Sequence, residues 1–192
     1  NEGFLTDGSV QWMTAGRGVV HSEMPEQTDG LMRGFQLWLN LPRNKKMIAP
    51  SYKDIHEEEI PVIQSDETKV KVISGEYQSV IGPGRPHTGV LYIDVYLEKG
   101  SSIDIPIEND WNAFVYVYEG ELSADTSISK GKLAVLDTQG QFSCKAMMNS
   151  TRFILVAGKP LHEPVARGGP FVMNTKEEIL QAFEDYQSGK IG

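Results

Sequence analysis

The sequence has one cysteine, a shortage of positive charge and no long apolar run, and each shortage excludes a class of protein. Cys144 is the single cysteine among 192 residues, which excludes an internal disulfide framework and favours a reducing compartment such as the cytoplasm. The net charge of −8 argues against direct nucleic-acid binding, because phosphate contacts need a concentrated basic surface. No apolar run approaches the length of a membrane span, and no charged-then-apolar leader opens the chain. These features predict a soluble protein with no membrane association.

Short runs with strand chemistry recur along the chain, separated by glycine, asparagine, aspartate or proline. In LYIDVYL, residues 91–97, aliphatic residues alternate with tyrosine and aspartate, the period-two pattern of a strand with one buried face. In NAFVYVYEGEL, Val115 and Val117 share one face in the same way. Strands at this density predict an all-β sandwich or barrel, with Cys144 as a small buried hydrophobe rather than a reactive thiol. The runs are SVQWM, GVVHSEM, GFQLWLNL, KVKVISG, GVLYIDVYL, SSIDIPI, NAFVYVYEGEL, KLAVLD, QFSCKAM and RFILVAG.

One helix is predicted near the end of the chain. Thr175 and Glu178 have the spacing of a capping box, and Gly189 can end the helix. The apolar residues between them follow helical spacing. They are Ile179, Leu180, Phe183 and Tyr186.

Two β modules are predicted on either side of a linker. Residues 49–67 are polar, acidic and bounded by prolines, which is typical of a linker with one helical turn. The modules are then residues 1–48 and residues 68–192, and the terminal helix belongs to the second module or returns to the first. The chain opens without a methionine and runs at once into a turn and a strand, so we expect a fragment whose earlier strands are missing.

The stretch GRGVVHSEMP, residues 16–25, places a histidine and a glutamate two residues apart. On a strand, His21 and Glu23 project from one face. Imidazole and carboxylate together suit a first-row metal such as iron. Two ligands do not complete a site, however, and an ion-paired or surface histidine and glutamate would have the same spacing. Spacing alone therefore leaves both interpretations open.

The other histidines are weaker candidates. His56 stands beside Glu57, Glu58 and Glu59, where a solvated charged face is the usual outcome, although such a cluster can hold a metal. His87 lies in a glycine- and proline-rich turn, where an exposed loop histidine is the simpler expectation and a position at the border of a pocket is the alternative. His162 and Glu163 fall in an extended, proline-flanked segment that favours salt bridging or chain positioning over metal ligation.

Two further groups have a functional and a structural interpretation. Arg17 stands between two glycines beside the candidate site and would there meet an anionic ligand, but a surface position is the simpler expectation. Large apolar residues on strands are most often core, yet four of them would also suit the lining of a cavity that accepts an aromatic ligand. They are Trp12, Met13, Met24 and Trp38.

Long motifs in a fixed order carry a resemblance to a known family. SVQWMTAGRGVVHSEMP, GFQLWLNLP, KMIAPSYKDI and LVAGKPLHEPVARGGPFVMNTKEEI together resemble the pirin family across nearly the whole chain. Pirins are members of the cupin superfamily. The resemblance implies a bicupin, in which two jelly-roll-like β-barrels pack face to face. Residues 1–48 would be the remainder of the N-terminal, metal-binding barrel, and residues 68–192 a metal-free C-terminal barrel with the terminal helix.

The resemblance also implies a mononuclear, non-haem iron held by three histidines and one glutamate. The HSE motif matches the family's second ligand pair, so His21 and Glu23 are carried over as iron ligands. The first pair, a His-x-His motif, has no counterpart in this chain, which leaves half of the site and predicts weak iron affinity unless another segment completes it. In the C-terminal barrel, Trp111 and Asn112 replace the metal histidines of a cupin motif.

Two functions from different classes are implied. One is an Fe(II)-dependent quercetin 2,3-dioxygenase, acting on a flavonol-like small molecule, with Glu23 as the catalytic group that accepts the substrate's hydroxyl proton. The other is a transcription cofactor without turnover, whose Fe(II) and Fe(III) forms differ in affinity for a protein partner, in the cytoplasm and, in a eukaryote, the nucleus. Whether this chain is itself an enzyme stays open, because half of the implied site is missing from it.

Overall fold

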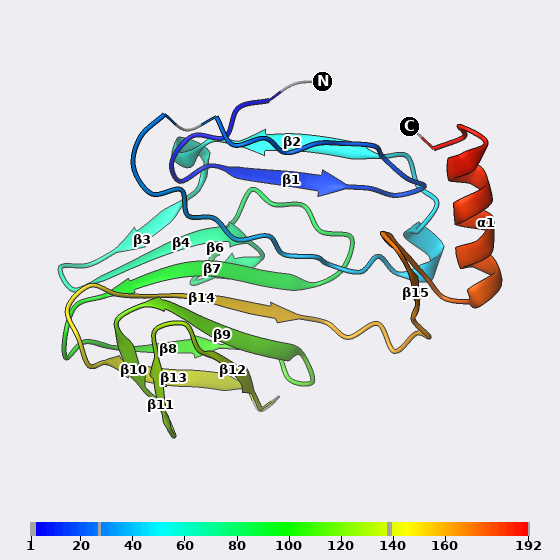
Figure 1. The fold of residues 1–192 in the computed structure, drawn as a ribbon. Coiled ribbons are helices and arrows are strands. Elements are labelled where there is room, and N and C mark those ends of the chain that lie inside the picture. Colours follow the sequence, from blue (N-terminus) through cyan, green and yellow to red (C-terminus); the bar gives the residue numbers. More distant parts are fainter. Residues whose placement is uncertain (1–2, 27, 138–139, 192) are drawn as a thin grey trace. The chain divides into compact units, whose positions relative to one another are not determined.

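The computed structural model describes residues 3–26, 28–137 and 140–191 (Figure 1). These described residues form mainly β-strands, with one α-helix among them in the C-terminal part of the sequence, which confirms the predicted fold class. The chain forms two compact units. The larger consists of Asn1–Trp12 and Lys53–Pro160, and the smaller of Met13–Tyr52 and Leu161–Gly192.

The larger unit contains two antiparallel sheets. The six-stranded sheet has the order β12-β9-β14-β7-β4-β3, and the four-stranded sheet has the order β11-β10-β13-β8. A short hairpin of β5 (Glu76–Tyr77) and β6 (Val80–Ile81) belongs to the same unit. The strands of the larger sheet are β3 (Val62–Gln64), β4 (Thr68–Ser74), β7 (Val90–Leu97), β9 (Asn112–Glu119), β12 (Leu133–Leu136) and β14 (Thr151–Gly158). Those of the smaller sheet are β8 (Ser102–Pro106), β10 (Glu121–Ser123), β11 (Ser127–Ser129) and β13 (Gln141–Ala146).

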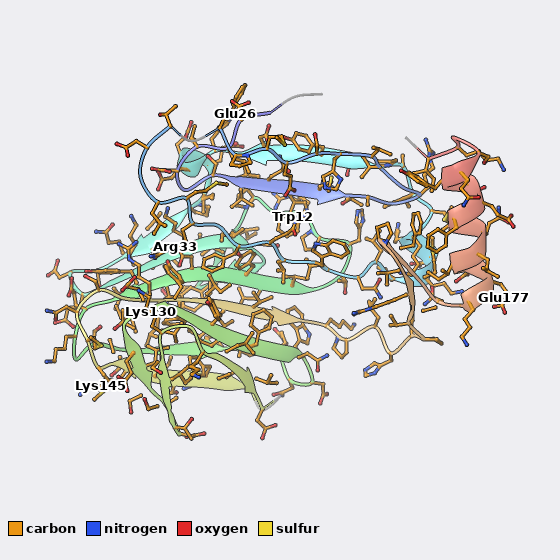
Figure 2. The ribbon with its side chains drawn as sticks, in the orientation of Figure 1. Trp12, Glu26, Arg33, Lys130, Lys145 and Glu177 are labelled. Atoms are coloured by element: carbon orange, nitrogen blue, oxygen red, sulfur yellow. The ribbon has the colours of Figure 1, made fainter. Side chains whose placement is uncertain are left out.

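Both sheets contribute to one apolar core, and side chains fill the space between them (Figure 2). On β14, Leu155 lies opposite Ile93 of β7 on one side and Val115 of β9 on the other, and all three side chains are inaccessible to solvent. The alternation predicted for β7 and β9 is therefore confirmed. Cys144, on β13, is a free and buried cysteine, as predicted, and burial raises the pKa of its thiol to about 12.

The smaller unit includes the terminal helix α1 (Lys176–Gln187) and a hairpin of β15 (Ala166–Gly168) and β16 (Phe171–Met173). The predicted capping box is present, since the Thr175 side chain accepts from the backbone N–H of Glu178 while the Glu178 side chain accepts from the backbone N–H of Thr175. The ring of Phe171 meets Phe183 of α1 edge-on, with centroids 5.1 Å apart. These contacts hold the helix against its own hairpin.

Two strands cross the division between the units. They are β1 (Val10–Thr14) and β2 (Ser51–Ile55), which pair in a two-stranded sheet. Residues 49–67, the predicted linker, contain β2, one helical turn η2 (Glu57–Glu59) and β3. The domain boundaries at residues 48 and 67 stay a prediction.

The predicted strands GVVHSEM, residues 18–24, and GFQLWLNL, residues 34–41, are not strands in the structure. Between β1 and β2 the described residues form only one short helical turn, η1 (Arg43–Lys45). Strand geometry depends on a neighbouring ladder of backbone hydrogen bonds, and the apolar side chains of these segments, such as Val20, Met24 and Trp38, are exposed. Local alternation therefore did not produce a strand here.

Candidate metal-binding site

The candidate site lies on the loop that follows β1, in the smaller unit. A turn at Gly16 and Gly18 leads out of β1, with the Gly18 N–H donating to Ala15 and the Arg17 N–H donating to the Ile48 carbonyl. Gly16 has φ of +55°, and a Cβ atom there would lie 2.2 Å from the Ile48 oxygen. Glycine is therefore required at this close approach between the two backbones.

His21 and Glu23 are brought together on this loop. The Nε2 atom of His21 lies 3.8 Å from Oε1 of Glu23, and the side chains are 43% and 55% exposed. The sequence spacing predicted that His21 and Glu23 share one face of a strand. In the structure the two residues lie on a loop, and the loop conformation brings their side chains together. Their role as metal ligands stays a prediction.

A third side chain, which the sequence did not mark, contacts Glu23. The side-chain amide of Gln36 donates to Glu23, with Nε2 3.3 Å from Oε2 and 3.5 Å from Oε1. Gln36 lies in GFQLWLNL, where its polar side chain among apolar residues was the one available signal. The amide contacts both carboxylate oxygens and leaves the carboxylate charge intact.

The donor set is chemically suited to a transition-metal ion. An imidazole nitrogen and a carboxylate oxygen are both ligands of first-row metals. Two donors that each lie about 2.0–2.2 Å from one ion are separated by roughly 3 Å when adjacent, so the observed 3.8 Å needs only a small adjustment. Among the residues that the structure describes, however, no group of three or more His, Cys, Asp or Glu side chains is arranged to hold a metal. His21 and Glu23 thus make up a partial site.

The acidic cluster next to His56 has other partners. Glu57 forms an ion pair with Lys71 at 2.6 Å, and Glu59 forms one with Lys53 at 3.2 Å. The hydrogen bond from Lys71 and its charge lower the pKa of Glu57, and the N–H of His56 donates to Glu59. The cluster is therefore a charged, helix-capping surface.

The remaining candidates have other surroundings. Glu163 accepts from the backbone N–H of Arg43 and from the side-chain amide of Asn174, contacts of the kind that chain positioning requires. Arg17 and His87 are exposed. Trp12 is half-buried on β1 (Figure 2), and its ring lies next to Gly84. Trp38 and Met24 are exposed, so the core expectation is wrong for both.

A buried polar cluster is the second feature that the sequence did not reveal. Lys46 is 6% exposed, and its ammonium donates to the Asn40 side chain at 2.7 Å and to the Val172 carbonyl at 3.1 Å. Burial lowers the pKa of Lys46, and the charges of Glu163 and Glu178 partly oppose this effect. We call Asn40, Lys46, Glu163, Asn174 and Glu178 the Lys46 cluster. It joins the segment after the candidate site to the C-terminal segment of the same unit.

In the part of the chain that the structure describes, no helix is long and apolar enough to cross a membrane.

The two sheets around one core have the architecture of a cupin. A family model described as the pirin C-terminal cupin domain matches residues 92–192, and one described as pirin matches residues 1–39.

Individual relatives agree with these family models. A pirin-like protein of Caulobacter vibrioides is 43% identical over 192 residues, covering 98% of this chain and 70% of its own length. The pirin of Mus musculus is 41% identical, with 99% and 67% coverage. A crystal structure of quercetin 2,3-dioxygenase from Acinetobacter baumannii superposes with a TM-score of 0.83 at 29% identity, covering 96% of this chain and 67% of that one. The chain belongs to the pirin family.

Proposed function

We propose that this protein is an iron-binding cupin of the quercetin 2,3-dioxygenase type, in which His21 and Glu23 supply two of the metal's protein ligands. The observation that carries the proposal is the 3.8 Å approach of the His21 Nε2 and Glu23 Oε1 atoms in a chain whose fold is similar to the Acinetobacter baumannii enzyme. When bound, iron supplies the Lewis-acid and redox chemistry that amino-acid side chains lack. Further ligands would come from solvent, from substrate, or from donors outside the described residues.

The side chains of the chain have separate tasks in this proposal. His21 would contribute the lone pair of its Nε2 atom to the metal. Glu23 would contribute a carboxylate oxygen to the metal and would accept the hydroxyl proton of a flavonol-like molecule. Its exposed position leaves the carboxylate within reach of a ligand that arrives from solvent.

Anaerobic titration with Fe(II), followed by a quercetin turnover assay in air, tests the proposal. We expect the unaltered chain to bind iron and His21→Ala to bind it more than about 100-fold more weakly, since even outer ligand-supporting groups are worth 10–100-fold in affinity. His87→Ala is the matched control, because His87 is an exposed histidine of the larger unit. Equal iron binding by all three chains would contradict the assignment, and iron binding without turnover would remove the dioxygenase activity.

A regulatory function is the second candidate, and the exposed apolar side chains of the smaller unit favour it. Val20, Met24, Leu31, Met32 and Trp38 are all exposed, so each of these apolar side chains is available for contact with a protein partner. In this case the Fe(II) and Fe(III) states would differ in affinity for a protein partner. Identical partner affinity of the oxidised and reduced protein would exclude this function.

A further inference from the structure

Gln36 lies thirteen positions after Glu23 in the sequence, and its side-chain amide nitrogen nevertheless contacts both carboxylate oxygens of Glu23. The two distances, 3.3 Å to Oε2 and 3.5 Å to Oε1, are similar, which places the NH₂ group between the oxygens rather than on one of them. Both residues lie in the smaller unit. The contact therefore restrains where the carboxylate group lies without removing either oxygen from further bonding.

The chemistry of this contact suits the support of a metal ligand. A ligating carboxylate usually has a hydrogen-bond partner that orients it, and each ionised oxygen has two acceptor sites. A lysine or arginine in this position would compete with a metal ion for the carboxylate charge. The neutral amide of Gln36 donates a hydrogen bond and adds no charge, so the attraction of Glu23 for a cation is preserved.

The geometry also relates Gln36 to His21. The Glu23 oxygen that faces His21 is Oε1, and the amide lies slightly nearer to the other oxygen, Oε2. Rotation of the Glu23 carboxylate would move Oε1 relative to the imidazole. A contact that restrains the Glu23 carboxylate therefore also restrains the distance between Oε1 and the imidazole of His21.

We propose that Gln36 is a positioning residue for the metal site, which orients the Glu23 carboxylate toward His21 through its side-chain amide. This inference rests on the proposed metal site and names a residue that acts through Glu23 rather than on the metal. Substitution of Gln36 by methionine keeps the length of the side chain and removes the donor. Gln181 offers a matched control, because it is a glutamine of the same unit that donates to a carboxylate, that of Asp185, at 3.1 Å.

The experiment measures metal affinity without turnover. Anaerobic Fe(II) titration of the full 192-residue chain should give a dissociation constant that rises about 10–100-fold in Gln36→Met and stays unchanged in Gln181→Met. The visible absorption of bound Co(II) reports ligand geometry independently, and we expect its spectrum to change in Gln36→Met alone. Circular dichroism should show equal folding of all three chains, since the side chains of Gln36 and Gln181 are exposed.

A double-mutant comparison separates positioning from a general structural effect. If Gln36 acts through Glu23, then Gln36→Met should weaken metal binding in the unaltered chain but add nothing in a Glu23→Ala background. Equal affinity and equal Co(II) spectra of the unaltered chain and Gln36→Met would overturn the role of Gln36 while leaving the metal site intact. A full additional loss in the Glu23→Ala background would also overturn it. Failure of the unaltered chain and of Gln181→Met to bind any metal would overturn both proposals together.

Discussion

The ammonium group of Lys46 donates to the side-chain oxygen of Asn40 at 2.7 Å while it is almost completely removed from solvent. A second donation, to the Val172 carbonyl, ties this lysine to the hairpin that precedes α1. Removing a charged group from water is unfavourable unless it is hydrogen-bonded. The two hydrogen bonds therefore offset part of the desolvation cost of the charged group and connect the two segments of the smaller unit.

Substitution of Lys46 by methionine should destabilise the smaller unit by about 1–3 kcal/mol, because Asn40 and the Val172 carbonyl lose their charged donor. Lys45→Met is the control, since Lys45 is exposed beside it in the sequence, and its effect should stay within about 0.5 kcal/mol. Urea unfolding monitored by circular dichroism gives both values. Equal effects of the two substitutions would show that burial of Lys46 does not contribute to stability.

The stability of the unaltered chain should rise with pH in the alkaline range relative to Lys46→Met. Burial lowers the pKa of Lys46 below its ordinary value of 10.5, so between the folded and unfolded pKa values the unfolded state binds more protons. Stability increases with pH in such a window and levels off near pH 10.5. Subtracting the two unfolding curves removes the opposite contribution of Tyr92, whose pKa is raised to about 12 by burial. A flat difference from pH 8 to 10.5 would contradict the lowered pKa.

Cys144 should be unreactive in the folded protein. Its thiol is buried and its pKa is raised to about 12, so at pH 8 almost none is the nucleophilic thiolate. Labelling with a thiol reagent should be at least about 100-fold slower than for a free cysteine and should become fast in denaturant. Ser143→Cys, at the adjacent exposed position, should react rapidly in the folded state; equally rapid labelling of Cys144 would contradict its burial.

Gly16→Ala should disturb the turn that leads to His21. The new Cβ atom would meet the Ile48 carbonyl at 2.2 Å in addition to the strain of a positive φ, and the expected destabilisation is about 2–4 kcal/mol. Gly100→Ala has positive φ but open space and should cost about 1 kcal/mol. Thermal unfolding distinguishes these cases. A cost for Gly16→Ala no larger than for Gly100→Ala would show that the backbone approach is not tight.

Prediction of strands and helix from the sequence was correct where the local residue pattern and the tertiary environment agree. The alternation around Ile93 and Val115 predicted the buried face correctly, and the capping box at Thr175 predicted the beginning of α1. It was wrong for residues 18–24 and 34–41, because a strand requires a partner that local alternation does not reveal. A shared face for His21 and Glu23 was predicted for a strand, and a loop provides their proximity instead.

The burial of Lys46 and the contact between Gln36 and Glu23 could not be predicted from sequence, for a physical reason. Lys45 and Lys46 are neighbours with the same chemistry, yet one is exposed and the other buried, because burial depends on contacts with residues more than a hundred positions away. Gln36 contacts Glu23 because of a loop conformation, and loops have no repeating residue pattern from which such a contact could be predicted. Such relationships belong to the tertiary structure alone.

The smaller unit is discontinuous, since its two segments flank residues 53–160. During synthesis on a ribosome, the whole larger unit emerges before Leu161, and it can fold while the smaller unit still lacks its second segment. Lys46 is made first, and its acceptor at Val172 is made only after more than a hundred further residues. A chain that stopped after Pro160 would retain the candidate ligands His21 and Glu23 and would leave the Lys46 ammonium without the carbonyl that helps to hold it in place.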